Sequence, residues 1–266
     1  MKASPTLTAD LRRGDETQVL LKLQQDGVTP DDYAAIAANE AMRADIVAAI
    51  QKYRLFTPPE EQVKILLRLN GLLWCDPAIT AEAIAALGAP PTAPDSGKNV
   101  LYAVVLLYET GDALTTFQRN WEACVAIHGE ERTWKWDGLV MTPKGVRPRE
   151  KAKPRPAGLR WAVAELGRAY QDIAVRDARV VQGSTELMGM GQELPLIAAL
   201  HPRWATSMNG KTIPFVDALD LEVAPDGEGE FGYAPCLNFD RDYGKVHLNA
   251  DDVDNSLRNF GSGSLQ

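Results

Sequence analysis

The apolar pattern of this chain changes across one basic, proline-containing segment. Up to about residue 140, apolar residues recur at steps of three and four, which is typical of amphipathic helices. Beyond residue 159, apolar and polar residues alternate in several places, which favours strands. We therefore expect three regions: a mostly helical region over residues 1–142, a basic Pro-rich connector over 143–158 and an α/β region with an acidic β-hairpin over 159–266.

Four polar residues mark helix starts in the first region. Thr29 precedes Pro30 and two acids, Thr57 opens a second capping box, and Thr80 and Asp112 each precede an apolar stripe. The first three helices have apolar faces that need a shared core. These features predict an N-terminal helical bundle.

The strand signals lie on both sides of the connector. Residues 100–108 form a short apolar run rich in Val and Tyr, and residues 159–164 alternate in polarity. These two segments could pair across the connector, which would make the chain a single domain. The fold class we expect is α+β, with a small, mainly antiparallel sheet and one or two packed helices.

The last third of the chain carries three further signals. Residues 193–208 have a helical pattern with Pro195 in the first turn and Pro202 at a bend, and residues 240–244 form a turn cluster inside a predicted hairpin. The ending F-G-S-G-S-L-Q is typical of a flexible tail. The segment 183–191 holds three glycines and two methionines, and we favour core packing over partner docking for it.

The formal net charge of −8 lies entirely in the last fifty residues. Residues 217–266 hold eleven acidic and three basic side chains, while residues 144–160 hold seven Lys and Arg against one Glu. The basic segment therefore has an intramolecular partner in the acidic end, and the asymmetry could also steer a binding partner. A sequence pI near 5.0 argues against a general nucleic-acid binder.

Bulk composition predicts the setting of the protein. The longest apolar run has nine residues, far fewer than the roughly 20 that cross a bilayer as a helix, so we expect a soluble protein that uses no membrane. The first residues have no signal-peptide pattern, and three widely spaced cysteines fit a reducing compartment. We expect a cytoplasmic protein without a cofactor.

Two helical neighbours are the weak candidates for a metal site. Cys124 and His128 stand four residues apart on one predicted helix, a spacing at which two side chains can share a metal ion. Both also continue an apolar stripe, and a free Cys behaves as a small core residue. We favour the core interpretation and predict no metal.

The other two histidines are the weak candidates for catalysis. His201 and His247 could transfer protons near neutral pH, but neither stands beside a nucleophile motif. His247 is expected on a solvated strand face, and His201 at a helix bend. A hydrolase that uses either histidine with a carboxylate is therefore an alternative interpretation.

The candidate interaction residues come from the connector and from one aromatic pair. Trp134 and Trp136 alternate on one side of a predicted strand, where interface anchors also occur. The basic candidates are Lys144, Arg147, Arg149, Lys151, Lys153 and Arg155. This segment could contact nucleic acid, although it lacks the interleaved aromatic residues that stack on bases.

Two stretches resemble a family of uncharacterised bacterial proteins. They are A-G-L-R-W at residues 157–161 and A-L-H-P-R-W-A-T-S-M-N-G-K-T-I-P-F-V at residues 199–216, of which L-H-P-x-W-x-x-x-M-x-G-x-x-x-P-F is the specific part. The resemblance covers about two thirds of the chain from Pro59 onward. It implies a shared fold and no activity, so no site residue follows from it.

Three functions remain open at this point. We favour a non-catalytic protein-interaction or assembly component, whose partner is another protein or a second copy of this chain. The alternatives are the hydrolase described above and a nucleic-acid-linked factor. That factor would act through Lys144 to Arg160, or its acidic end would mimic phosphate.

Overall fold

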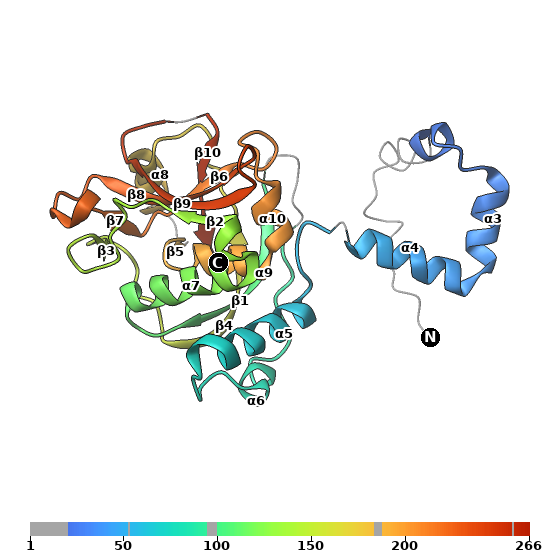
Figure 1. Cartoon of the computed structure of the whole chain (residues 1–266), viewed down its shortest axis with the longest axis horizontal. Coiled ribbons are helices and arrows are strands. Elements are labelled where there is room, and N and C mark those ends of the chain that lie inside the picture. Colours follow the sequence, from blue (N-terminus) through green and yellow to red (C-terminus); the bar gives the residue numbers. More distant parts are fainter. Residues whose placement is uncertain (1–20, 53, 95–99, 184–187, 257) are drawn as a thin grey trace. The chain divides into compact units, whose positions relative to one another are not determined.

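The computed structural model describes residues 21–52, 54–94, 100–183, 188–256 and 258–266 (Figure 1). The chain forms two compact units, Met1–Arg54 and Leu55–Gln266. The division thus falls at residue 54 and not at the predicted connector, which lies inside the second unit. The α+β class expected from the sequence is present, since the second unit contains both helices and two sheets.

The first unit contains helices α3 (Pro30–Ala38) and α4 (Glu40–Lys52). The predicted start at Thr29 is confirmed: its hydroxyl accepts the Asp32 N–H at 3.3 Å, and the Asp32 carboxylate accepts the Thr29 N–H at 2.7 Å. None of the side chains described for these two helices is buried. The structure therefore gives no support to a helical bundle with a shared core over residues 1–142.

Helix α5 (Pro59–Leu69) belongs to the second unit and packs on strand β1 and helix α9. The predicted capping box at Thr57 is wrong, because the helix begins one residue later, with Pro58 as a cap that has no side-chain donor or acceptor. A π-helical turn (Asn70–Trp74) follows α5, and the predicted cap Thr80 does start helix α6 (Ala81–Ala85).

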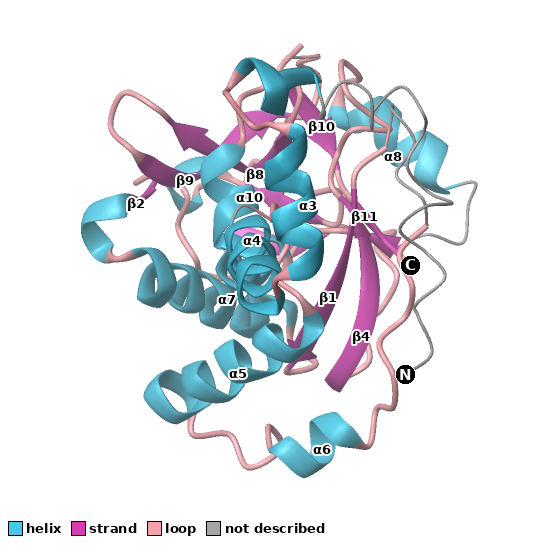
Figure 2. Ribbon diagram, turned by 90° about the vertical axis from the view of Figure 1, so that its right-hand side faces the viewer, coloured by secondary structure: helices cyan, strands magenta, loops and turns pink. Residues whose placement is uncertain are grey.

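The first sheet has four antiparallel strands in the order β1 (Tyr102–Glu109), β4 (Gly158–Glu165), β11 (Ser264–Leu265) and β5 (Met188–Gly189). Strands β1 and β4 pair along their full lengths, from Tyr102 opposite Glu165 to Glu109 opposite Gly158 (Figure 2). The pairing across the basic segment that the sequence allowed is therefore present. It brings both ends of that segment into one domain.

A helical layer packs next to the first sheet. Helix α7 (Ala113–His128) packs against α9 (Leu194–Leu200), all seven residues of which are buried. As predicted, the Asp112 carboxylate caps α7 by accepting the Thr115 N–H at 2.7 Å, and Gly129 ends the helix with a φ of +93°. The predicted bend at Pro202 is also present, because α10 (Pro202–Ser207) starts there.

The second sheet has seven strands and mixed pairing. Its order is β10 (Phe260–Ser262), β6 (Phe215–Asp217), β8 (Tyr233–Asp240), β7 (Leu221–Val223) and β3 (Val146–Pro148), with β9 (Lys245–Asp252) joining β8 to β2 (Thr133–Lys135). Strands β8 and β9 form the predicted hairpin. Its turn is closed by the Asp240 carboxylate, which accepts the N–H groups of Asp242 and Tyr243.

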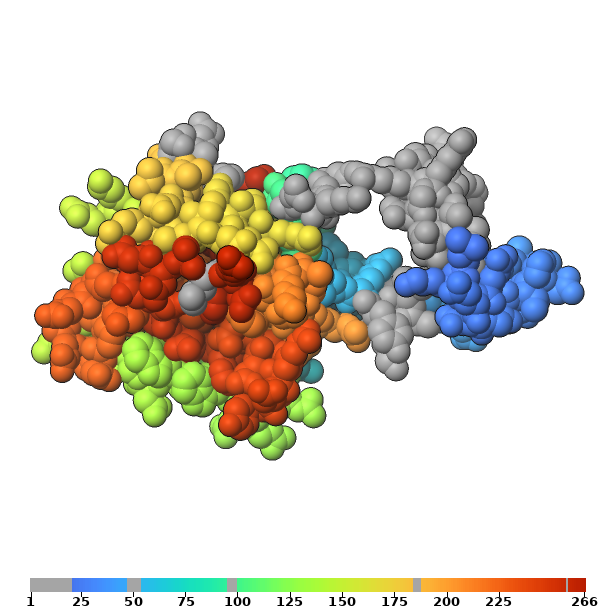
Figure 3. Space-filling model, turned by 90° about the horizontal axis from the view of Figure 1, so that it is seen from above, coloured from blue at the N-terminus to red at the C-terminus, as the bar shows by residue number. Residues whose placement is uncertain are grey.

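Two short 3-10 turns, Glu130–Arg132 and Pro225–Gly227, and helix α8 (Val175–Gly183) complete the unit. Helix α8 contacts β10 and β5. Figure 3 shows the surface of this region, where the yellow residues around α8 lie beside the red C-terminal strands. Among the helices in the described ranges, none has the length and apolar content needed to cross a membrane.

The flexible tail predicted for the last seven residues is wrong. Residues 261–265 are buried, and the Gln266 N–H and carbonyl both bond to the backbone of Val163. Strand β11 lies between β4 and β5 and pairs with both. The backbones of Gly167 and Gly261 approach so closely that a Cβ at Gly261 would overlap the Gly167 carbonyl.

Candidate functional site

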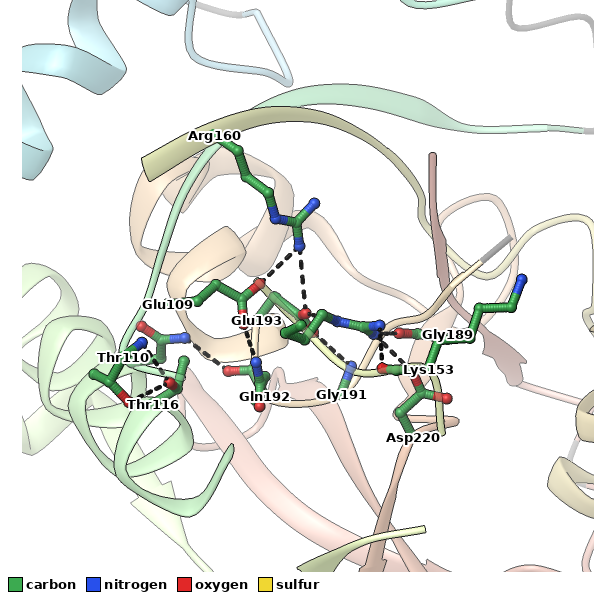
Figure 4. A network of polar contacts seen from close by, with 12 residues as sticks. Glu109, Thr110, Thr116, Lys153, Arg160, Gly189, Gly191, Gln192, Glu193 and Asp220 are labelled. Atoms are coloured by element: carbon green, nitrogen blue, oxygen red, sulfur yellow. Dashed lines mark hydrogen bonds and ion pairs between the residues drawn. The ribbon is translucent and has the colours of Figure 1, made fainter. Parts of the chain in front are cut away.

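A chain of buried ion pairs lies beneath the basic segment (Figure 4). Arg155 contacts Glu193 at 2.5 Å (Nε to Oε1) and Asp220 at 2.7 Å (Nη2 to Oδ2), and its side chain is only 8% exposed. Arg160 on β4 contacts Glu109 on β1 at 2.7 Å. Each charge therefore has an opposite charge within contact distance, which buried ionised groups require.

The basic segment also pairs with acidic residues of the C-terminal fifty, as expected. Arg147 contacts Glu222 at 3.1 Å, and Arg149 lies 3.9 Å from Asp220. Arg155 adds the Asp220 contact described above. Strand pairing explains the match, because β3 and β7 are antiparallel neighbours that place Arg147 directly opposite Glu222. The basic segment is thus held against the rest of the second unit by these ion pairs and is part of its folded structure.

Two carboxyl groups at the inner end of this network have opposite pKa shifts. Burial, together with the charge of Glu193, raises the pKa of Glu109 to about 7, although Arg160 opposes this shift. Burial also works against ionisation of Glu193, but Arg155 outweighs it and lowers the pKa of Glu193. The Gln192 amide donates to Glu109, and Asn120 in turn holds the Gln192 carbonyl at 2.7 Å.

A cavity of about 660 Å³ opens between the basic segment and helix α8. We call it the basic cavity. Five cationic and three anionic side chains line it. The cationic ones are Arg149, Lys151, Lys153, Arg176 and Arg179, and the anionic ones are Glu150, Asp220 and Glu222.

A second cavity of about 500 Å³ lies against the same segment. It is lined by the start of α7, by Arg155 and by Gln192, and it shares Arg149 and Asp220 with the basic cavity. Arg149 therefore borders both cavities. Its Nε is buried and has no hydrogen-bond acceptor among the residues that the structure describes. An unsatisfied buried donor is costly, so this atom is suited to an acceptor from a ligand.

The other groups around the basic cavity are held firmly. Arg179 on α8 donates to the backbone carbonyls of Leu219 and Leu221, both at 2.9 Å, and burial lowers its pKa to about 10. Burial raises the pKa of Asp220, and the charge of Arg155 opposes that shift. The cavity wall thus presents guanidinium groups whose positions are set by the backbone of β7 and by the ion pairs.

The histidines proposed for catalysis lie in separate surroundings. His201 is fully buried, its Nδ1 accepts the Thr57 N–H at 3.0 Å, and burial lowers its pKa to about 4. The ring of His247 on β9 packs against that of Trp134 in a tilted arrangement with centroids 4.7 Å apart, and partial burial lowers the pKa of His247. No hydrogen bond or ion pair to a carboxylate is present for either ring in the described part of the chain.

The two residues considered for a metal site, Cys124 and His128, have different surroundings. Cys124 is buried in the core, and burial raises the pKa of its thiol. His128 directs Nε2 toward the Ala198 carbonyl at 3.1 Å, and burial lowers its pKa. Within the described ranges, no group of three or more His, Cys, Asp and Glu side chains is arranged to hold a metal ion.

The remaining predicted interaction residues divide between two places. Trp134 is 37% exposed, and Trp136 is half-buried with its ring 6.4 Å from that of Tyr233. Lys144 is exposed and outside the lining of both cavities, whereas Lys151 lines the basic cavity and Arg149 and Lys153 line both. The structure therefore gathers the central part of the basic segment around one cavity and leaves the tryptophans elsewhere.

Sequence reasoning missed the residues that complete the site. Arg176 and Arg179 stand three apart on α8, a spacing that could have placed both on one helical face. Glu109, Glu193, Asp220 and Glu222 lie far from the basic segment in sequence, and no local spacing identifies them. The pairing of β1 with β4 brings Glu109 to the strand of Arg160, and the pairing of β3 with β7 places Glu222 opposite Arg147.

No protein-family model matches this chain, and neither a curated protein nor a solved structure matches it. The resemblance carried by residues 157–161 and 199–216 therefore stays a prediction. In the structure these residues form β4, the end of α9, α10 and β6, all in the second unit.

Proposed function

We propose that this protein is a non-catalytic binding component that recognises an anionic group of a partner in the basic cavity. The observation that carries the proposal is the convergence of cationic side chains from two separate segments. Arg149, Lys151 and Lys153 come from the basic segment, and Arg176 and Arg179 come from helix α8. Charge complementarity of this kind gives specificity and accelerates encounter with an oppositely charged partner.

The fixed position of the segment supports the same proposal. A flexible basic linker would lose conformational entropy on binding, whereas this segment is already ordered by the contacts of Arg155 with Glu193 and Asp220. The volume of about 660 Å³ lies within the range of roughly 300–1,000 Å³ that is usual for ligand pockets. The cavity is therefore preorganised and large enough for a ligand group.

The contacts in the structure give less support to the two alternative functions, a hydrolase and a nucleic-acid-linked factor. The hydrolase hypothesis needs a histidine beside a carboxylate, and the described contacts of His201 and His247 supply none. A nucleic-acid-linked factor would use the same cations, but a cavity between two segments receives one anionic group more readily than the continuous groove that tracks a nucleic-acid backbone. We therefore keep nucleic acid as an outcome of the tests below.

Isothermal titration calorimetry of the full chain with inorganic pyrophosphate at low salt tests this proposal. We expect saturable binding that weakens about tenfold in the double variant Lys151→Ala/Arg176→Ala, because two cations leave the cavity lining. The matched control is Lys211→Ala/Arg241→Ala, which removes one exposed Lys and one exposed Arg from another part of the surface. Equal weakening by both double variants, or no binding by the wild type, would contradict the proposal.

A further inference from the structure

We infer that the basic cavity takes a phosphate monoester, a dianionic group, in preference to a monoanionic ester. This inference rests on the proposed function and names the chemistry of the group that is recognised. It follows from the charge of the lining, from the donors that remain available and from the way the carboxylates of the wall are neutralised.

The lining carries a net charge of +2 when its five cations and three carboxylates are all ionised. A phosphate monoester carries a charge of about −1.5 to −2 at pH 7 and offers three strong acceptor oxygens. A sulfate ester or a phosphodiester carries one negative charge. The dianion therefore matches the lining most closely.

Two of the three carboxylates are neutralised from outside the cavity. Asp220 contacts Arg155 at 2.7 Å, and Glu222 contacts Arg147 at 3.1 Å, and neither of these arginines lines the basic cavity. Among the lining cations, Arg149 lies 3.9 Å from Asp220 and Arg179 lies 3.9 Å from Glu222, while Arg176 contacts Asp254, which does not line the cavity, at 2.6 Å. Arg147 and Arg155 from outside thus pair with two lining carboxylates, Asp254 pairs with one lining cation, and the cavity keeps its surplus of positive charge.

The available donors also suit a phosphate group. Within the described ranges, Arg149 keeps a buried Nε without an acceptor, next to its Nη2. Arg179 uses Nε and Nη2 on backbone carbonyls, and its Nη1 lies 3.9 Å from Glu222. An arginine fork can bind two phosphate oxygens at once, which a lysine cannot do. Arg149 is therefore the residue that we expect to hold the phosphate.

A matched pair of small probes tests this inference on the full chain. Phenyl phosphate and phenyl sulfate share one organic group, but only the phosphate becomes a dianion, with a second pKa of about 6. Calorimetry at pH 8 should show phenyl phosphate binding at least about tenfold more tightly. At pH 5 the phosphate is mostly monoanionic, so the preference should shrink to about threefold or less.

The sulfate probe controls for titration of the protein itself. The charged groups that face the cavity are Glu150, Asp220 and Glu222 together with the five cations, and their protonation affects both probes. Equal affinity for the two probes at pH 8 would overturn the phosphate inference and leave the proposed anion binding intact. Binding of neither probe would remove both.

The conservative variant Arg149→Lys separates charge from geometry. It keeps the positive charge and removes the guanidinium fork, so the preference for phosphate at pH 8 should fall from about tenfold to below about threefold. An unchanged preference in a variant with a wild-type circular dichroism spectrum would contradict the assignment to Arg149.

Two further ligands identify the source of the phosphate. A short peptide with one phosphoserine that binds more tightly than phenyl phosphate supports a phosphorylated partner protein. Equal binding supports a small phosphorylated molecule. A single-stranded oligonucleotide that binds more tightly than either would overturn the inference, because its phosphodiesters are monoanionic.

Discussion

At the scale of single residues, buried polar side chains replace missing partners of the backbone. Gln62 on α5 is fully buried and behaves as part of a neighbouring strand: its Nε2 donates to the Val104 carbonyl at 2.8 Å, and its Oε1 accepts the Leu106 N–H at 3.0 Å. It thereby closes the free edge of β1. Sequence periodicity placed Leu66 on the buried face of α5 but could not show that Gln62 is buried there as well.

Replacement of Gln62 should therefore destabilise the second unit. Gln62→Leu leaves the Val104 carbonyl and the Leu106 N–H buried without partners, at a cost of about 1–3 kcal/mol each. We expect a loss of roughly 2–5 kcal/mol in the free energy of unfolding, measured by urea denaturation. Glu60→Leu changes an exposed residue of the same helix and should cost less than about 0.5 kcal/mol. Similar losses in both variants would refute the role of Gln62.

Glu109 makes stability depend on pH. Its pKa rises from 4.5 in the unfolded chain to about 7 in the folded protein, because of burial and the nearby Glu193. The neutral carboxyl is favoured in the folded state, so its contribution is present below about pH 4.5 and is lost as pH rises through about 7. Glu109→Gln should remove this part of the pH dependence of the free energy of unfolding, which is worth roughly 3 kcal/mol at most.

The measurement is the free energy of unfolding at several pH values from 4.5 to 8. Glu165 is an independent comparison, since burial raises its pKa to about 7 as well, against the opposing effect of backbone N–H donors such as that of Ala169. Each single variant should flatten the profile in part, and the double variant should flatten it further. A Glu109→Gln profile parallel to that of the wild type would show that Glu109 is ionised throughout.

At the scale of elements, local sequence signals predicted several helix starts and one hairpin. Contacts between residues far apart in sequence determined the start of α5 and the position of the C-terminal strand. The starts at Thr29, Thr80 and Asp112 and the hairpin of β8 and β9 are governed by neighbours in sequence, so the sequence was sufficient for them. The Thr57 start was wrong because tertiary contacts with His201 use its backbone N–H. The last residues look like a linker, yet β4 and β5 accept them as a central strand.

The close approach of two glycines gives a test of that C-terminal arrangement. Gly261→Ala would place a methyl group against the Gly167 carbonyl, which can move only if β10 shifts. We expect a loss of about 2–4 kcal/mol from this overpacking, measured by thermal or urea unfolding. Gly232→Ala is the matched control, because no atom lies within 4 Å of the added Cβ. A stable Gly261→Ala protein would contradict the packing of β10 against residue 167.

At the scale of the whole molecule, the uneven charge of the chain is explained by folding. The basic segment and the acidic end are far apart in sequence but become walls of the same cavity, joined by Arg147, Arg149 and Arg155. The sequence therefore predicted that the two charged regions meet. It could not predict the cavity, because helix α8 and the β3–β7 pairing supply half of the lining.

The division at residue 54 leads to a prediction about the domain. The side chains described for α3 and α4 are not buried, whereas the second unit contains a continuous apolar core from Leu66 to Leu265. A fragment of residues 55–266 should therefore fold and unfold cooperatively, with a Tm within about 3 °C of that of the full chain. Calorimetry checks this, and a fragment without a cooperative transition would show that residues 1–54 are required.

The central claim is that the basic segment and helix α8 form one anion-binding cavity. NMR amide shifts of the full chain, recorded during titration with phenyl phosphate at pH 8, test this claim most directly. We predict saturable shifts concentrated in residues 148–155 and 175–183, with one apparent Kd for both segments. Shifts spread over the exposed lysines and arginines of the whole surface, or confined to one of the two segments, would contradict it.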